Sequence, residues 1–527
     1  MVLRNITRNG FERLENGFDW IFSPAWNPFY QLGALGWFFY WIVCVSGIYL
    51  YIFFDTGIND AYESLEYITN VQWYAGGVMR SLHRYASDAM VIVVILHLLR
   101  EYVMDRYRGV RWFAWITGVP LLWFLIACGI SGYWMVWDIL AQYVATVTTE
   151  WLDALPIFGE PIARNFLNEA TLGSRFFTLM VFIHIALPLI MLFVMWIHIQ
   201  RHARPKVNPP RGLAAGTMAM LLVLSLVYPA VSQAPANLDT VPSTVGIDWF
   251  YLPAYPLLDV ISGAALWAIV GAGTLLLLCL PWLPRGRRHD AAVVDLGNCN
   301  GCGRCYNDCP YSAVTMEPRT DGLPYARQAV VNPDQCTGCG LCVGACPTAT
   351  PFRRASALVP GIDLPNFNMR DLRERILAAA KALSGTDRVM VFGCQAGADL
   401  SLLEGPSVAV LPLRCIGMLP PPFIDFMITR HYVDGVLLTG CREGDCHYRL
   451  GIKWTEQRLS GLRDPYLRQR VPRERVSQAW YGPTQFPPLA QQLETFRGRL
   501  RALGPLPRRK PRVKVKKTAV QELDSHG

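Results

Sequence analysis

Residues 83–97 read HRYASDAMVIVVILH, and residues 184–198 read HIALPLIMLFVMWIH. In each stretch one histidine opens a largely apolar run and a second histidine closes it, 14 positions later. Fourteen residues advance an α-helix by about 21 Å and return nearly to the same face. Two such helices facing each other would hold two pairs of imidazoles at two depths. The spacing therefore predicts an all-α bundle built around His83, His97, His184 and His198.

The apolar stretches of the first half are long enough to cross a lipid bilayer, which takes about 20 helical residues. The chain has 527 residues, of which 52% are hydrophobic and 17% charged, and a mean hydropathy of +0.23. These values exclude a wholly soluble or disordered protein. We expect six transmembrane helices, over residues 32–54, 79–103, 112–137, 174–200, 213–231 and 257–283.

Basic residues alternate between the loops of these helices. The loop after the second helix carries Arg106, Arg108 and Arg111, whereas residues 55–72 carry no Lys or Arg at all. By the positive-inside rule, both termini face the cytoplasm of a prokaryotic cell membrane. No cleavable signal precedes the first helix. The formal net charge of +9 is spread over loops and tail, so a nucleic-acid partner is not expected.

Two stacked pairs of histidines are what two six-coordinate haems require, whereas a lone histidine in a membrane helix is more often a polar relay. Glycines repeat the same spacing of 14, which would let a macrocycle lie against a helix; close helix packing is the alternative. These glycines are Gly33, Gly47, Gly118 and Gly132. Arg80 and Arg100 lie three residues outside the histidines of their helix and would pair with haem propionates or snorkel to the interface.

Residues 1–283 resemble cytochrome b of the bc-type complexes. The resemblance rests on Arg80-x-x-His83, His97-x-x-Arg100, the four glycines, Gly132-Tyr133 with Trp137, and residues 170–184. It implies that His83 and His184 ligate an outer haem b, and that His97 and His198 ligate an inner one. The later helices of that family are absent from this sequence.

The segment Asp248-Trp249-Phe250-Tyr251 aligns with the Pro-Glu-Trp-Tyr motif of the outer quinol pocket in that family. Ile247 replaces the proline of the motif, Asp248 the glutamate and Phe250 the tyrosine. The resemblance implies that Asp248, Trp249 and Tyr251 line a quinone pocket. The alternative is a plain belt of aromatic residues at the membrane interface. His202 is a candidate for a second pocket on the cytoplasmic side, although loop charge explains it nearly as well.

Twelve of the 15 cysteines lie between Cys299 and Cys446. Their spacing is typical of metal ligands in a protein of a reducing compartment, and not of the disulfides of a secreted protein. A run of the form Cys-x2-Cys-x2-Cys-x3-Cys-Pro occurs twice, and in such runs the fourth cysteine ligates the cluster of the other run. One [4Fe–4S] cluster then takes Cys299, Cys302, Cys305 and Cys346. The other takes Cys336, Cys339, Cys342 and Cys309, and zinc is the alternative to both.

The remaining thiols of this half are Cys394, Cys415, Cys441 and Cys446. The first three each follow a predicted strand, and the carboxyl ends of parallel strands converge on one edge. Spacing alone predicts a four-cysteine metal site and leaves zinc open. Residues 385–465 resemble the delta subunit of methyl-viologen-reducing hydrogenases, which implies a [2Fe–2S] cluster and a docking role; His447 is a further candidate ligand, or a neighbour of the ligands.

The expected fold is therefore multi-domain. A cytochrome b-like bundle precedes a ferredoxin-like 2[4Fe–4S] domain and a small α/β domain with a parallel sheet. The expected limits are 1–283 for the bundle, 284–294 for a linker, 295–352 for the ferredoxin domain, 353–384 for a linker or helix, 385–465 for the α/β domain and 466–527 for a basic, partly disordered extension. Residues 508–517 would contact anionic lipid or an acidic partner, or be a solvated end.

Together these modules predict a membrane-bound electron-transfer subunit. The expected order is the [2Fe–2S] module, two cubane clusters, inner haem, outer haem and quinone. The sequence resembles no flavin- or nucleotide-binding motif. We therefore expect a soluble flavoprotein, or a heterodisulfide-reductase-like or hydrogenase-like subunit, to dock on residues 385–465 in a multi-subunit complex. Whether this complex forms a dimer is left open by the sequence.

The direction of electron flow is open, with quinone reduction expected at a quinone-reactive site of the subunit itself. The alternatives are a quinol-oxidising cytochrome b of a Rieske-type complex, and transfer from quinol to the clusters driven by the membrane potential. A third hypothesis makes the helices chiefly an anchor for a soluble enzyme.

Overall fold

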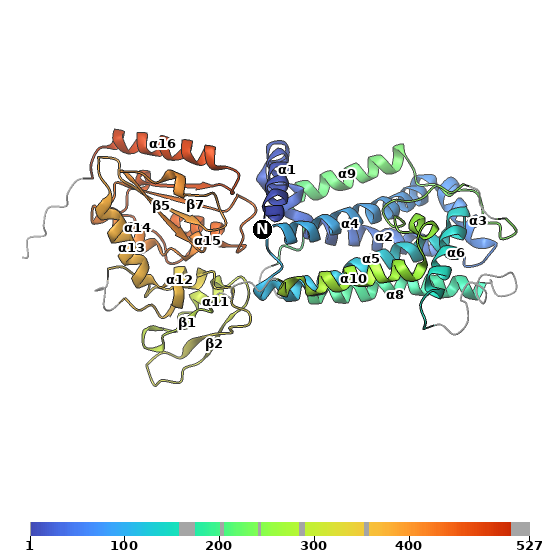
Figure 1. Cartoon of the computed structure of the whole chain (residues 1–527), viewed down its shortest axis with the longest axis horizontal. Coiled ribbons are helices and arrows are strands. Elements are labelled where there is room, and N and C mark those ends of the chain that lie inside the picture. Colours follow the sequence, from blue (N-terminus) through green and yellow to red (C-terminus); the bar gives the residue numbers. More distant parts are fainter. Residues whose placement is uncertain are drawn as a thin grey trace, which may run out of the picture.

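The structure is a computed structural model that describes residues 2–157, 174–200, 205–240, 244–283, 290–352 and 358–506. Long helices lie side by side in one half of the molecule, and a soluble half of strands and shorter helices caps one end of them (Figure 1). The helix α1 (Val2–Trp26) lies at the junction between the two halves. We call the capped end of the bundle the inner end and the opposite end the outer end.

Helices form at all six expected stretches: α2 (Leu32–Phe53), α4 (Val78–Val103), α5 (Trp112–Val136), α8 (Ser174–Ile199), α9 (Arg211–Val227) and α10 (Gly263–Cys279). Within the described residues, four helical segments are long and apolar enough to cross a membrane, and they contain α2, α5, α8 and α10. The helix α4 carries several charged side chains, and α9 has 17 residues. The crossing of the membrane by these two helices stays a prediction.

The surface of the bundle supports a lipid environment. On α8, Leu189, Phe193 and Trp196 are each more than half exposed, at 61%, 60% and 56%. Large apolar side chains gathered on one exposed surface are typical of contact with lipid or protein. Because the apolar residues cover whole helices instead of one stripe, we assign this surface to the membrane interior.

The outer end of the bundle carries short helices and an ordered loop. The helices are α3 (Asp60–Glu66) and α6 (Ile139–Asp153). Asp138 caps α6 by accepting a hydrogen bond from the Ala141 backbone at 2.9 Å, and it also accepts one from the Gln233 backbone at 2.8 Å. The carboxylate thus ties the segment after α9 to the start of α6. Of the two short helices expected in residues 138–172, the second falls on residues outside the described ones.

The carboxyl-terminal part of the soluble half is a parallel sheet with strand order β6-β5-β7-β8. The strands β5 (Val389–Cys394), β6 (Val408–Leu413) and β7 (Gly435–Gly440) match the expected ones, and β8 (Val476–Trp480) is additional. The helices α13 (Met369–Ala382), α14 (Pro421–Thr429), α15 (Gly451–Ser460) and α16 (Phe486–Leu503) accompany the sheet.

The α/β unit extends past residue 465, where the sequence predicts a basic extension. The strand β8 pairs with β7, and α16 buries Leu489, Leu493 and Phe496. This difference arises because α16 is amphipathic, so its many basic side chains lie on the outer face while its leucines complete the core.

Two short hairpin-like sheets hold the cysteine-rich segment. One pairs β2 (Val314–Pro318) with β3 (Arg327–Val331), and the other pairs β1 (Val293–Val294) with β4 (Ile362–Asp363), both antiparallel. The helices α11 (Arg304–Asp308) and α12 (Leu341–Ala345) each begin after a glycine with positive φ, Gly303 and Gly340. A side chain there would strain the backbone, so glycine permits the chain to turn tightly between neighbouring cysteines.

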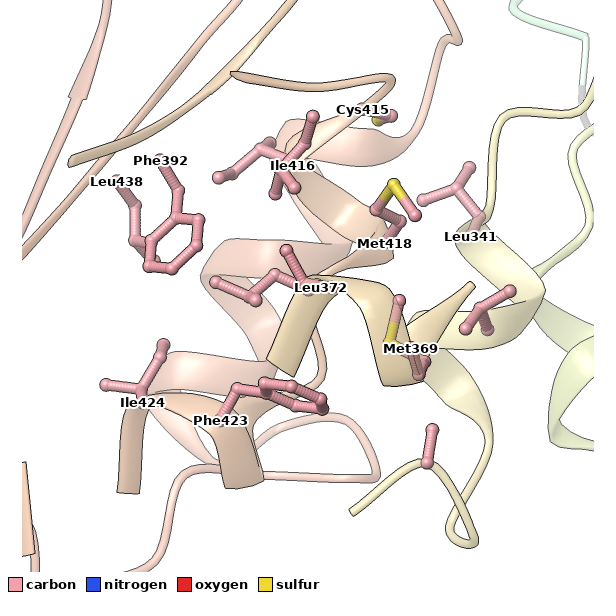
Figure 2. Close-up of a cluster of buried hydrophobic side chains, with 14 of the residues drawn as sticks. Leu341, Met369, Leu372, Phe392, Cys415, Ile416, Met418, Phe423, Ile424 and Leu438 are labelled. Atoms are coloured by element: carbon pink, nitrogen blue, oxygen red, sulfur yellow. The ribbon is translucent and has the colours of Figure 1, made fainter. Parts of the chain in front are cut away.

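The cysteine-rich segment and the α/β unit share one hydrophobic core. Figure 2 shows Leu341 of α12 next to Met418, with Leu372 and Met369 of α13 below them and Phe392 of β5 to one side. All five of these side chains are essentially inaccessible to solvent. The two parts therefore pack as one body and are not tethered independently.

Candidate functional site

Histidines of α4 and α8 face each other at two depths of the bundle. At the outer depth, the ring centroids of His83 and His184 are 6.3 Å apart. Two bonds of about 2 Å from imidazole nitrogens to one metal ion would hold the ring centres about 6 Å apart. His97 and His198 lie 14 residues further along the same helices and interact with each other electrostatically. The separation of the outer pair thus fits the expected axial ligands of a haem, and the inner pair lies on the same two helices.

Each of the four expected glycines faces one of these histidine rings. A Cβ atom at Gly47 would lie 3.0 Å from Cε1 of His83, and one at Gly132 would lie 3.0 Å from Cε1 of His184. The corresponding distances at the inner depth are 3.6 Å for Gly33 with His97 and 3.3 Å for Gly118 with His198. The glycines make room for the imidazoles of the neighbouring helix, and this contact is additional to the macrocycle packing expected from the sequence.

Two cavities in the cysteine-rich segment gather the expected cysteines in crossed sets. The first is lined by Cys309, Cys336, Cys339 and Cys342. The second is lined by Cys299, Cys302, Cys305 and Cys346. Backbone amides of Ala292 and Ala313 donate hydrogen bonds to the sulfurs of Cys336 and Cys309, at 3.5 Å and 3.3 Å. Amide donors to thiolate sulfur are one means by which proteins tune iron–sulfur clusters.

The other four thiols meet at the carboxyl edge of the parallel sheet. Cys394 ends β5 and contacts the thiols of Cys415 and Cys441, and Cys446 contacts the same two thiols from the other side. The Ile416 amide donates a hydrogen bond to the Cys394 sulfur at 3.0 Å. The four sulfurs therefore form a closed set.

His447 adjoins this set through its backbone. Its amide donates to the Cys441 sulfur at 3.4 Å, while its ring packs edge-on against Tyr448 at a centroid distance of 4.8 Å. Burial holds the pKa of His447 well below its usual value, so the ring is neutral. These contacts place His447 next to the four thiols.

Comparisons with known proteins agree with this division of the chain. Residues 18–202 match the family model described as cytochrome b/b6/petB, residues 298–350 that of the 4Fe–4S dicluster domain, and residues 398–504 that of the methyl-viologen-reducing hydrogenase delta subunit. The chain joins regions similar to these three families. The third match begins four residues after Cys394.

One solved structure similar to this chain is titled "Hyperthermophilic respiratory Complex III". The likeness covers 48% of this chain and 75% of that chain, with 23% sequence identity and a TM-score of 0.40.

The family matches fix the broad function of the chain. A cytochrome b region binds haem b, and a 4Fe–4S dicluster region binds iron–sulfur clusters. Together with the long apolar helices, these regions make the chain a membrane subunit of electron transport.

Hydroxyl groups in the cytochrome b region orient three of the four histidines, which the sequence analysis missed. Ser46, Thr117 and Ser131 lie within hydrogen-bonding distance of Nδ1 of His83, His198 and His184, at 3.2, 3.0 and 3.0 Å. A partner at Nδ1 selects the tautomer in which Nε2 is free to bind metal. Each of these hydroxyl residues directly precedes one of the four glycines spaced 14 residues apart. The repeated pairs Thr117-Gly118 and Ser131-Gly132 could therefore have indicated these hydroxyl groups from the sequence.

The structure gives both expected propionate partners other contacts. Arg80 donates to the Thr69 and Ser232 hydroxyls, at 2.5 and 2.8 Å. Arg100 pairs with Glu15 at 2.7 Å and with Asp445 of the soluble half at 2.8 Å. The pairing of either arginine with a propionate stays a prediction.

A group of charged residues lies near the outer depth of the cytochrome b region. Asp248 is bound by Arg84 at 2.9 Å and by the Tyr133 hydroxyl, and Arg84 also binds Asp88 at 3.1 Å. Tyr251 is buried, with its hydroxyl 2.5 Å from Ser87. The structure thus brings Asp248 and Tyr251 beside residues of α4 and α5.

Trp249 lies apart from this group, because 67% of its surface is exposed. Such exposure fits the alternative of an interfacial anchor for this residue. The sequence analysis missed Arg84, Asp88 and Ser87, although their charge or polarity within an apolar helix was a signal. His202 falls on residues outside the described ones.

Proposed function

We propose that the chain transfers electrons between a soluble redox protein and the membrane quinone pool, in the direction of quinone reduction. The observation that carries this proposal is the arrangement of its ligand sets. Two histidine pairs are stacked along the bundle, and the cysteine sets are gathered in the soluble half that caps its inner end. Bound haem and clusters supply one-electron transfer, and the side chains of this chain hold and space them.

The proposed cofactors are two haem b, two [4Fe–4S] clusters and one [2Fe–2S] cluster. In a cubane each iron takes one protein sulfur, and in a [2Fe–2S] cluster each iron takes two. A tetrahedral zinc site would take three or four ligands on one ion. The match of residues 298–350 to the 4Fe–4S dicluster model supports clusters over zinc at the crossed sets, and the match of residues 398–504 to the delta-subunit model supports a [2Fe–2S] cluster at Cys394, Cys415, Cys441 and Cys446.

The proposed topology has six helices crossing the membrane, with the inner end in the cytoplasm. Arg106 and Arg111 bind Asp445 and Tyr311 of the soluble half, and by the positive-inside rule these basic residues support a cytoplasmic inner end. The soluble half would then meet its partner, a flavoprotein or a heterodisulfide-reductase-like or hydrogenase-like subunit, in the cytoplasm. The limits expected for the individual domains stay proposals with this topology.

The proposed quinone site lies at Asp248 and Tyr251. Reduction of a quinone to a quinol takes two electrons and two protons. Asp248 and Asp88 share the single cation Arg84, so the group carries one excess negative charge in a low-dielectric region. Binding a proton on one of the two carboxylates removes that excess charge. We propose that this carboxylate pair takes up a proton from the aqueous side and passes it to a quinone oxygen.

Replacing Asp248 tests the quinone site. We expect Asp248→Asn to lower quinone reduction by about 10²-fold, because a positioned acid–base group contributes about that much. Haem and cluster absorbance should be unchanged. Trp249→Phe is the matched control, since this exposed side chain should leave the rate nearly unaltered. Equal rates in the wild type and Asp248→Asn would contradict the site, and a spectrum without b-type haem would contradict the proposed function as a whole.

The copurifying subunits separate this proposal from the Rieske-type alternative. We expect purification of the complex in mild detergent to recover a soluble flavoprotein or a hydrogenase-like or heterodisulfide-reductase-like subunit. Recovery of a Rieske protein, with reduction of the haems by quinol as the first step, would establish the alternative instead.

A further inference from the structure

The loop between the third and fourth thiols of the delta-subunit region lies against the inner end of the cytochrome b region. Asp445, which directly precedes Cys446, accepts two hydrogen bonds from Arg106, at 2.7 and 2.8 Å. Arg100 of α4 pairs with the same carboxylate at 2.8 Å. A two-pronged guanidinium contact fixes direction as well as distance.

A second ion pair runs in the opposite direction across the same junction. Arg442, from the soluble loop, binds Glu15 of α1 at 2.8 Å and the Tyr30 hydroxyl at 3.0 Å. Glu15 in turn binds Arg100 at 2.7 Å. Each half thus contributes both an acid and an arginine to one connected network, which we call the junction network: Glu15, Arg100, Arg106, Arg442 and Asp445.

The junction network is largely buried. The exposed fractions of the Arg100, Arg106 and Asp445 side chains are 4%, 12% and 14%, and that of Glu15 is 1%. Burial opposes the charge on Asp445, but Arg100 and Arg106 outweigh it and hold its pKa well below the usual range. Buried ion pairs of this kind favour one geometry of a contact, because a shift would leave a buried charge unpaired.

The network connects two proposed metal sites by a short path. Arg100 follows His97 by three residues, which is a rise of about 4.5 Å along α4. On the other side, Asp445 is bonded covalently to Cys446, one of the four thiols. The path from the inner histidine pair to the four-thiol set therefore runs along one helical turn and one ion pair.

A competing path leads to one of the two cubane cavities. Arg111 donates to the Tyr311 hydroxyl at 3.0 Å, and Tyr311 lines the cavity of Cys309, Cys336, Cys339 and Cys342. This contact is a hydrogen bond from a guanidinium to a phenol, and the same guanidinium lies 6.0 Å from the centre of the Tyr311 ring. The junction network has several charge-assisted contacts, so it holds the four-thiol set more firmly than this contact holds the cubane cavity.

We propose that the junction network positions the four-thiol centre as the direct neighbour of the inner haem. This inference rests on the proposed function and changes the order expected from the sequence, in which the cubane clusters lie between these two centres. The four thiols would hold a cluster and His97 with His198 would hold a haem, and these groups would supply one-electron exchange across the junction without a proton transfer. Because the loop is buried at the junction, a soluble partner binds elsewhere on the soluble half.

The full-length protein with all its cofactors provides the test. Asp445→Asn removes the shared acid at almost constant volume, and Tyr311→Phe is the matched control on the competing path. The first measurement is the magnetic relaxation of the reduced four-thiol centre by the oxidised haem, which reports their distance without turnover. The second is the rate at which the haems are reduced after mixing with dithionite.

We expect Asp445→Asn to weaken the magnetic coupling and to slow haem reduction about ten-fold, since small displacements cost this much or more. Arg106→Lys should lose less, because it keeps the charge. Tyr311→Phe should match the wild type. If Asp445→Asn fails to fold, Arg106→Lys and Cys441→Ser replace it in the test. Cys441→Ser removes one of the four thiols and with it the four-thiol centre. A wild-type rate in Cys441→Ser, or slowing in Tyr311→Phe alone, would overturn the proposal.

Reduction of the haems by quinol separates a failure of the junction-network proposal from a failure of the proposed function. It should be normal in every variant, because the quinone site lies at the other end of the bundle. Loss of quinol-driven haem reduction in the wild type would contradict the proposed function, whereas slow reduction from the cluster side alone bears on the junction network.

Discussion

At the scale of single residues, the missing side chains matter as much as the histidines. Gly47 and Gly132 stand 3.0 Å, measured from a hypothetical Cβ, from the rings of His83 and His184. The helices α5 and α8 can pack this closely only because nothing projects from the glycine into the imidazole. The neighbouring hydroxyls of Ser46 and Ser131 then hold Nδ1 of these rings.

Replacing Gly132 with valine tests this packing. The added methyl groups would drive His184 from its position, at a cost of about 1–3 kcal/mol in unfolding free energy for overpacking. We expect loss of the haem at the outer pair and retention of the inner one, measured by absorbance and redox titration of the purified protein. Gly271→Val on α10 is the control, because a Cβ there meets nothing within 4 Å. Equal haem content in both variants would contradict the assignment.

At the scale of elements, the two cysteine runs exchange their last members. The turns at Gly303 and Gly340 wrap three cysteines of each run around one cavity, and the short helix that follows carries the chain to the other cavity. Cys346 therefore lines the cavity of the first run, and Cys309 that of the second. Neither run can complete its own site.

The exchange predicts crossed losses when the fourth cysteine of a run is removed. We expect Cys346→Ser to alter the cluster of Cys299, Cys302 and Cys305, and Cys309→Ser to alter the other one. Electron paramagnetic resonance of the two reduced proteins should show different signals missing or changed. Loss of the same signal in both variants, or loss within the same run, would show that the ligands are not exchanged.

At the scale of the whole molecule, the soluble half is one cooperative body docked on a helical bundle. Leu341 of the dicluster region packs against Met418 of the delta-subunit region, and both are fully buried (Figure 2). The core continues from there to Phe392 in the parallel sheet. Damage at this contact should therefore affect both iron–sulfur regions together.

Leu341→Ala tests the shared core. The cavity it leaves should lower the unfolding free energy of the soluble half by about 2–5 kcal/mol. We expect all cluster absorbance to be lost at one lower urea concentration, while the haem absorbance persists. Leu402→Ala is the control, since 70% of that side chain is exposed. Loss of the dicluster signals alone would show that the two regions unfold independently.

The sequence determined what depends on local spacing. The sequence alone shows the histidines 14 residues apart, the cysteine runs with a terminal proline and the thiols that follow strand-like runs. The family matches confirm the three regions in their predicted order. The strand β8 and the helix α16 were not found, because a strand at a sheet edge and a basic amphipathic helix have a polar composition.

Only the tertiary structure decided which parts meet. Asp445 lies 339 positions from Arg106 in the chain, so no spacing in the sequence links them. Likewise, Asp248 contacts Arg84 of α4 and Tyr133 of α5 only because folding brings these helices next to it. Ion pairs between distant segments depend on packing of the whole core, because charges find their partners only after the apolar faces have fixed the helices in place.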